Sequence, residues 1–226
     1  MIEIYLVDTS SIKDEEFDKY YNVVRKERQI KIDRYKRYED KKLSLAVGIA
    51  LKNALQNNNV DYFNATFCVT DKGKVYLENN KDDLHFNVSH SGKYAVAVIS
   101  NQEVGVDVQQ IKPYNEKVVK KCFTEKEKVH FYKIEEAQRD LEFATIWAMK
   151  ESYLKAIGIG ITEKLDGFET EYDEKSGNGN VSYICNTEGK SYPDARIRIL
   201  KNVQGYALSI CCLENVEEVK VRKLEN

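Results

Sequence analysis

Apolar residues recur with two different periods along this chain, and each period predicts one kind of element. Residues 2–7 form a short apolar run typical of a strand, whereas Asp14 to Gln56 is charged, with apolar residues at helical spacing. These apolar positions are Leu43, Val47, Ala50, Leu51 and Ala54. The chain is therefore expected to begin with one strand and to continue as helices, which end at the Asn-rich stretch 57–61.

Strand-like runs dominate the middle of the chain. They are separated by Asp-Lys-Gly, Asn-Asn-Lys and Ser-Gly turns. The runs cover residues 65–69, 74–77, 84–90, 94–99 and 103–109.

The second half repeats the order of helices followed by strands. Helical spacing returns after Pro113, and Thr124 followed by Glu127 spells a capping box, which predicts a helix to about Glu136. A longer helix is expected over residues 140–157, closed by Gly158. Strand-like runs then follow at 167–172, 180–185, 195–200 and 205–213.

This order predicts an α+β fold with two lobes of similar size. The expected lobes are residues 1–102 and 103–226. Because no segment rich in proline, serine or a single charge separates them, we expect the lobes to share a broad interface.

Composition supports a folded protein and excludes several classes. The 226 residues are 42% hydrophobic, 32% charged and 11% aromatic, which argues against a disordered chain. No apolar run approaches the roughly 18 residues that a membrane span requires. The first residues, MIEIYLVDTS, are expected to form a strand rather than an export signal. Five cysteines without paired spacing indicate reduced thiols in a cytoplasmic protein, not a disulfide framework or a zinc site.

The net charge of −2 hides a basic segment. Between Arg25 and Lys42 nine basic residues accompany four acidic ones. Such a segment attracts an anion, and the sequence leaves open a phosphate ligand, nucleic acid or an acidic partner. For most of these side chains, a solvated helix with ion pairs one turn apart is the favoured explanation.

Residues 104–109 place a glycine and an acid where a strand disfavours both. Strict alternation puts Val104 and the other valines on one face, with Gly105, Asp107 and Gln109 on the other. A glycine beside an aspartate lets a bulky neighbour approach the backbone while the carboxylate meets a cation. A plain solvent-facing side of the strand is the alternative.

Two further segments carry candidate chemistry. On the expected helix, Glu151 and Lys155 lie one turn apart beside an apolar stripe that includes Trp147. This spacing is typical of a surface ion pair, but beside a buried tryptophan a half-desolvated pair is the alternative. In FNVSHSG, Ser89 and His90 stand at the edge of a loop; as adjacent strand residues they point apart, so they are not a nucleophile and its base.

Together, FNVSHSG, VGVDV and WAMKESYLKAIG resemble the 4′-phosphopantetheinyl transferase superfamily, in particular its long Sfp-type branch. The family signature is a Gly-x-Asp strand followed by a Trp/Phe-x-x-Lys-Glu-x-x-x-Lys helix. The residues that fill it are Gly105, Asp107, Trp147, Lys150, Glu151 and Lys155. The resemblance extends along nearly the whole chain.

The resemblance implies two pseudo-symmetric α+β lobes with coenzyme A in the cleft between them, which is the active site. It implies transfer of phosphopantetheine from coenzyme A to a carrier-protein serine, releasing 3′,5′-ADP. Mg²⁺ is expected on Asp107 and Glu151, with Gln109 contributing directly or through water, because oxygen ligands suit this ion. Close relatives carry an acid at the position of Gln109, so weaker metal affinity is expected here.

The remaining roles also come from the resemblance. Glu151, or a water beside it, takes the proton of the carrier serine, and Lys155 neutralises or protonates the departing 3′,5′-ADP. Coenzyme A is expected to be bound by Arg28, Lys31, Ser44, Gly73, Lys74, Ser89, His90 and Lys155. Val75 replaces the proline that usually follows the Gly-Lys pair of this family.

The expected partners are coenzyme A and apo acyl or peptidyl carrier domains, with no nucleic acid and no membrane. A monomer is expected, since the trimeric fatty-acid enzymes of this superfamily are about half as long. Two alternatives stay open: an enzyme acting mainly on the fatty-acid carrier, and a non-catalytic module that binds anions or nucleic acid through residues 25–42. The second leaves the acids at 107 and 151 without a role.

Overall fold

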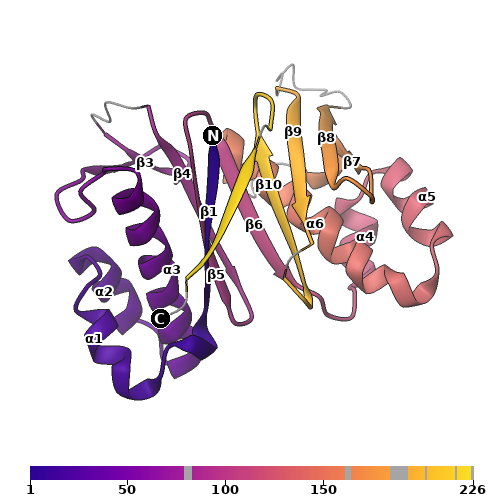
Figure 1. Cartoon of the computed structure of the whole chain (residues 1–226). Helices are drawn as coiled ribbons and strands as arrows, with labels where there is room; N and C mark the ends of the chain where they lie inside the picture. Colours follow the sequence, from indigo (N-terminus) through magenta and orange to yellow (C-terminus); the bar gives the residue numbers. More distant parts are fainter. Residues whose placement is uncertain (79–82, 161–163, 184–192, 202, 217, 225–226) are drawn as a thin grey trace.

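The computed structural model describes residues 1–78, 83–160, 164–183, 193–201, 203–216 and 218–224. Strands occupy the middle of the molecule and helices lie at its two ends (Figure 1). The helices are α1 (Phe17–Tyr21), α2 (Lys26–Asp33), α3 (Tyr38–Asn57), α4 (Glu116–Cys122), α5 (Glu125–Lys133) and α6 (Arg139–Ile157). None of the helices in these ranges is long and apolar enough to cross a membrane.

The strands form two sheets and one small hairpin. The first sheet has the order β11-β1-β5-β4, the second has the order β6-β10-β9-β8-β7, and β2 pairs with β3. The strands are β1 (Ile2–Asp8), β2 (Phe67–Val69), β3 (Val75–Leu77), β4 (His85–Ser91), β5 (Tyr94–Ser100), β6 (Val104–Gln110), β7 (Phe168–Tyr172), β8 (Asn178–Tyr183), β9 (Ala195–Leu200), β10 (Tyr206–Cys212) and β11 (Val219–Leu224). Each sheet is covered by one long helix, which confirms the α+β class.

The strand β11 was not predicted. Its residues, VKVRKL, are half charged, and it runs parallel to β1 at the edge of the first sheet. A sheet built otherwise from residues before 103 therefore takes its last strand from the end of the described chain. The capping box on α5 is confirmed, although this helix ends at Lys133 rather than near 136.

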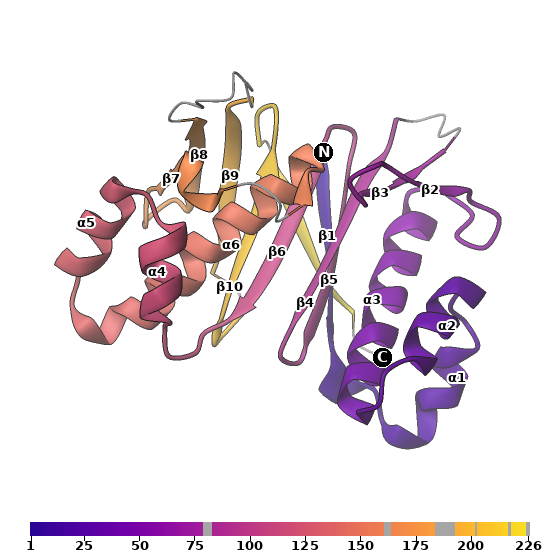
Figure 2. The ribbon, with the colours of Figure 1, turned by 180° about the vertical axis from the view of Figure 1, so that it is seen from behind.

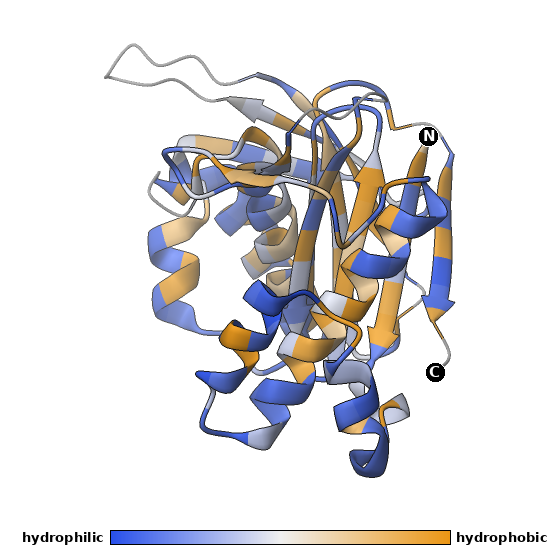
Figure 3. Ribbon diagram, turned by 90° about the vertical axis from the view of Figure 1, so that its left-hand side faces the viewer, coloured by the Kyte–Doolittle hydropathy of each residue, from blue (hydrophilic) through white to orange (hydrophobic). Residues whose placement is uncertain are grey.

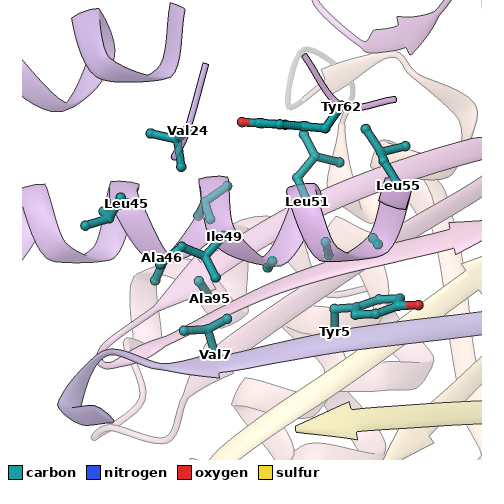
Figure 4. Close-up of a cluster of buried hydrophobic side chains, with 14 of the residues drawn as sticks. Tyr5, Val7, Val24, Leu45, Ala46, Ile49, Leu51, Leu55, Tyr62 and Ala95 are labelled. Carbon is teal, nitrogen blue, oxygen red and sulfur yellow. The ribbon is translucent and has the colours of Figure 1, made fainter. Parts of the chain in front are cut away.

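The larger apolar clusters of the described residues hold the molecule together. Helix α3 packs on β1 and β5, with Tyr5, Val7 and Ala95 beneath it and Val24 above it (Figure 4). Helix α6 packs on the second sheet. The third cluster joins residues of β1 and β5 to residues of β6 and β10, so the two lobes share a core. Coloured by hydropathy, the apolar residues concentrate on the central strands and the polar ones on the outer helices (Figure 3).

Strands β4 and β6 meet along a seam made by side chains. The backbone N–H groups of β6 donate to side-chain oxygens of β4 instead of to its carbonyl groups. Val106 N donates to Asn87 Oδ1 at 3.2 Å, Val108 N to Ser89 Oγ at 3.4 Å and Gln110 N to Ser91 Oγ at 3.0 Å. The seam therefore leaves the two strands a side chain's length apart, and α3 and α6 lie on either side of it (Figure 2).

Candidate active site

Gly105 lets helix α6 lie directly on strand β6. A Cβ built on Gly105 would be 2.0 Å from the carbonyl oxygen of Ser152 and 2.4 Å from the backbone nitrogen of Ala156. Only glycine permits this approach, because the contacting atoms are backbone and cannot rotate away. The close neighbour expected beside Gly105 is thus α6, and this contact brings Glu151 and Lys155 to the face of β6 that carries Asp107.

Asp107, Ser89 and Lys155 form one hydrogen-bonded group in the seam. The Lys155 ammonium donates to Asp107 Oδ1 at 2.6 Å and to Ser89 Oγ at 3.1 Å. The Ser89 hydroxyl donates to the same Asp107 oxygen at 2.7 Å. Lys155 therefore pairs with the strand acid, and the surface pair that its spacing from Glu151 suggested is not its role.

Two buried carboxylate oxygens, one in this group and one on Glu151, have no hydrogen-bond partner among the residues that the structure describes. Asp107 is 6% exposed and Glu151 is 7% exposed, yet Asp107 Oδ2 and Glu151 Oε1 are buried without a donor. Burial raises the pKa of Glu151, the negative charge of Asp107 raises it further, and Lys155 opposes both effects. A buried carboxylate oxygen without a donor is costly. Because the charges of Asp107 and Glu151 also repel each other, their two unpaired oxygens indicate a place for a cation.

Two cationic residues, Arg28 and Lys31, and the imidazole of His90 lie on the other side of the seam. Burial lowers the pKa of the Arg28 guanidinium, and among the described residues no acidic side chain pairs with it. Desolvation and then Arg28 lower the pKa of Lys31. The pKa of His90 is lowered by desolvation and by Lys31, Lys155 and Arg28, against a small opposing effect of Asp107. These residues are close enough to repel one another, so the region favours an anion.

A pocket of about 320 Å³ adjoins this cationic group. Arg28 and Lys31 contribute to its rim, and its apolar wall includes Tyr62 and Phe67. The Arg25 guanidinium lies 4.7 Å from the centre of the Phe67 ring and donates to the carbonyl oxygens of Tyr62 and Ala65, which fixes that wall. The pocket thus offers an apolar surface and positive charge side by side.

Two further expected site residues, Ser44 and Gln109, lie on α3 and β6. The Ser44 hydroxyl is buried in α3 without a partner, and Ser44 is 3% exposed. Gln109 lies two residues beyond Asp107 on β6 and is half-buried. Within the described ranges, no group of three or more His, Cys, Asp or Glu side chains has the arrangement of a metal site.

Gly73 and Lys74 lie in the turn between β2 and β3. Gly73 has a φ of +88°, which a glycine adopts without strain. The Lys74 ammonium is bonded to Glu103 and donates to the carbonyl oxygen of Ala156 at 2.6 Å. Lys74 therefore caps the C-terminal end of α6 and its charge is already paired, unlike that of Arg28.

The Lys150 ammonium makes contacts inside the protein that the family signature did not predict. It is fully buried, pairs with Glu127 at 2.9 Å and donates to the carbonyl oxygens of Leu165 and Phe168. Glu127 in turn accepts from Thr170. Lys150 thus joins α6 to α5 and β7, although the next residue, Glu151, faces the seam. Neighbouring residues of a helix point 100° apart, and this spacing could have predicted that Lys150 and Glu151 face different surroundings.

Comparisons with known proteins identify the family of the chain. Residues 103–211 match the profile of the 4′-phosphopantetheinyl transferase superfamily, and residues 11–103 match that of the 4′-phosphopantetheinyl transferase N-terminal region. The chain therefore belongs to the 4′-phosphopantetheinyl transferase superfamily.

Individual relatives refine this class. The 4′-phosphopantetheinyl transferase gsp of Aneurinibacillus migulanus is 30% identical over 228 residues, which cover 100% of this chain and 92% of the relative. The 4′-phosphopantetheinyl transferase Sfp of Bacillus subtilis is 24% identical over 201 residues, 88% of this chain and 87% of the relative. The crystal structure of Thermotoga maritima holo-[acyl-carrier-protein] synthase is 23% identical, with a TM-score of 0.40 over 50% of this chain and 64% of that one. The chain is thus a 4′-phosphopantetheinyl transferase of the Sfp type.

Proposed function

We propose that this enzyme transfers the 4′-phosphopantetheine group of coenzyme A to a serine of an apo acyl or peptidyl carrier domain and releases 3′,5′-ADP. The proposal rests on one observation: buried carboxylate oxygens without a donor and a cation without an acidic partner among the described residues lie close together at the seam. On one side are the buried oxygens of Asp107 and Glu151, and on the other is the unpaired Arg28 with its cationic neighbours. The names of the relatives support the same reaction.

The donor set in the seam fits Mg²⁺. Asp107 and Glu151 would hold the ion through their unpaired oxygens, and Gln109 would add its amide oxygen directly or through water. All three supply oxygen, the ligand that hard cations prefer. When bound, the ion would neutralise charge on the diphosphate of coenzyme A.

The cationic side would bind the nucleotide end of coenzyme A. Arg28, Lys31 and His90 would hold the 3′-phosphate, with the buried hydroxyl of Ser44 as a further donor. Charge-assisted contacts of this kind are stronger than neutral hydrogen bonds. For Gly73 and Lys74 we propose contact with the adenine through the turn backbone, because Glu103 and Ala156 already occupy the lysine ammonium.

The reaction itself needs little covalent chemistry from the enzyme. The serine oxygen of the carrier attacks the phosphorus that bears the pantetheine, and the bond from that phosphorus to 3′,5′-ADP breaks. Glu151 takes the serine proton, for which its raised pKa suits it. Lys155 and the Ser89 hydroxyl orient the diphosphate, and Lys155 neutralises the leaving 3′,5′-ADP. Catalysis is then mainly positioning and charge stabilisation.

A mass measurement tests the proposal. The protein is incubated with coenzyme A, Mg²⁺ and a panel of apo peptidyl and acyl carrier domains, including the fatty-acid carrier, and each carrier is then weighed. A gain of one phosphopantetheine is expected, and it should disappear in the Asp107→Ala/Glu151→Ala variant. No gain on any carrier, combined with salt-sensitive binding to random RNA, would favour a nucleic-acid-binding module instead.

The same proposal includes the organisation of the enzyme. We infer two functional lobes, residues 1–102 and 103–226, that act as a monomer in the cytoplasm, with the site at their junction. The shared core between the sheets supports action as one unit. Light scattering during turnover should give the mass of one chain.

A further inference from the structure

Helix α2 carries a half-buried arginine, Arg28, between two buried apolar residues. Val24, which precedes the helix, and Ile32 within it are buried, with 2% and 0% exposure. Arg28 lies one turn before Ile32 on the helix, and both Arg28 and Val24 lie against Gly48 of α3. This face of α2 packs against α3. An arginine at such a position needs space for its stem and a route for its charge to reach the edge of the interface.

Gly48 of α3 supplies that space. A Cβ built on Gly48 would be 2.8 Å from Val24 Cγ1 and 3.0 Å from Arg28 Cγ, closer than normal contacts. Val24 lies on the side of α3 that faces away from the sheet, so α2 crosses α3 there (Figure 4). The stem of Arg28 therefore lies directly on the backbone of α3.

The neighbouring residue on this face of α3 also matters. Ser44 lies one turn before Gly48, and its buried hydroxyl has no partner. The face of α3 that supports the Arg28 stem therefore also presents an unsatisfied donor. The close approach of Val24 and Arg28 requires a glycine at position 48, whereas packing does not explain the buried hydroxyl of Ser44.

We propose that Gly48 is a positioning residue that sets the reach of Arg28 toward the 3′-phosphate and thereby determines selectivity for nucleotides that carry this group. This inference rests on the proposed function. A side chain at position 48 would lift the Arg28 stem from α3 and move the guanidinium away from Lys31 and His90. Glycine is unusual inside a helix, and here its missing side chain is what the anion site requires.

Calorimetry with two nucleotides tests the inference without turnover. The probes are 3′,5′-ADP and 5′-AMP, which differ only in the 3′-phosphate. The parent protein should bind 3′,5′-ADP more tightly, and Gly48→Ala should weaken that binding by about tenfold, the effect of losing one charge-assisted contact. Binding of 5′-AMP should stay unchanged. Gly167→Ala is the matched control, because a Cβ there would meet nothing within 4 Å.

A second variant separates the two contacts of Gly48. Val24→Ala/Gly48→Ala removes the closer contact with Val24 and keeps that with Arg28, so binding of 3′,5′-ADP should remain weak. Recovery of affinity in this double variant would show that helix spacing, not the arginine stem, is responsible, and would overturn the inference. Equal selectivity in Gly48→Ala and the parent would also overturn it. A parent protein that does not distinguish the two nucleotides would refute the proposed phosphate site itself.

Discussion

The two oxygens of Asp107 have different surroundings. Oδ1 accepts from Ser89 and Lys155, whereas Oδ2 is buried without a donor. A carboxylate whose one oxygen is fixed by two donors presents the other in a defined direction. Lys155 and Ser89 therefore orient Asp107, besides the contact with the diphosphate that we propose for them.

Removal of the Arg28 charge should affect substrate binding more than turnover. Loss of one charge-assisted phosphate contact costs about 1.5–3 kcal/mol. We expect Arg28→Ala to raise the KM for coenzyme A by about one to two orders of magnitude with kcat nearly intact. The control is Arg34→Ala, which removes an exposed charge from the end of the same helix. A fall in kcat at unchanged KM would contradict the assignment.

Gln109 should limit the affinity for magnesium. Gln109→Glu adds a negative charge beside the two carboxylates, so the Mg²⁺ concentration for half-maximal rate should fall and Mg²⁺ binding measured by calorimetry should tighten. Gln110→Glu places the same charge on the adjacent residue, which points to the other face of β6. Gln110→Glu is the control and should keep the Mg²⁺ dependence of the parent. If Gln109→Glu kept it as well, Gln109 would not face the ion.

Binding of 3′,5′-ADP should take up a proton at His90. In the free protein desolvation, Lys31, Lys155 and Arg28 keep the pKa of His90 below its ordinary value, with Asp107 opposing them. A bound phosphate favours the charged imidazole and raises that pKa. Affinity should therefore strengthen as pH falls through the region around and below about 7. Calorimetry in buffers of different ionisation enthalpy measures the uptake, which His90→Gln should abolish.

At the scale of elements, α6 is buried on more than one face. One face lies on β6 and β10 through small residues such as Ala144 and Ala148, and another carries Met149 and Tyr153 into the core of the second lobe. Lys150 ties that second face to α5 and β7. These contacts fix the rotation of α6 about its axis, so Glu151 and Lys155 cannot turn away from the seam.

Gly105 should be the most sensitive position of this contact. An alanine Cβ would collide with backbone atoms of α6, so Gly105→Ala should lower the free energy of unfolding by about 3 kcal/mol, the upper end of the range for overpacked cores. The displaced helix should also lower kcat. Chemical denaturation and steady-state kinetics measure the two effects, with Gly167→Ala as the control. Full activity in Gly105→Ala would show that α6 tolerates displacement.

Across the whole molecule, the lobes are joined at both ends of the seam. At one end the chain passes twice from one lobe to the other, and the Gln102 side chain links the two passages. Its Oε1 accepts from Glu214 N, and its Nε2 donates to the carbonyl oxygen of Asn215. At the other end the backbone N–H of Lys93 donates to Tyr206 Oη, and the Tyr94 and Tyr206 rings pack edge to face. These contacts hold the two halves of the site in register.

The strand β11 should contribute to stability from outside the site. Ending the chain after Asn215 removes its pairing with β1 and the half-buried Val219 and Val221, so we expect a loss of about 2–4 kcal/mol in the free energy of unfolding. Arg222→Ala, which removes an ion pair with Glu3 and a contact with the Tyr5 ring but keeps the strand, should cost less than about 1 kcal/mol. Equal losses in the two variants would mean that the strand pairing adds nothing.

Much of the fold was predictable because local patterns are strong in this chain. Alternation gave β6, and the capping box and Gly158 gave the start of α5 and the end of α6. The strand β11 escaped because its alternation, Val219-Lys220-Val221-Arg222, is short and its residues are half charged; its pairing with β1 makes it a strand. The role of Lys150 escaped because burial of a charge depends on partners distant in the sequence.

The sequence by itself determined which elements form and which residue types are available for the chemistry, because period and turn signals act over a few neighbouring residues. Tertiary structure alone decided that Lys155 pairs with Asp107, that Lys74 caps α6 and that Arg28 stays unpaired. These outcomes depend on how closely two helices and two sheets approach. That distance is set by packing across the whole molecule, and at two places by the absence of a side chain, at Gly105 and at Gly48.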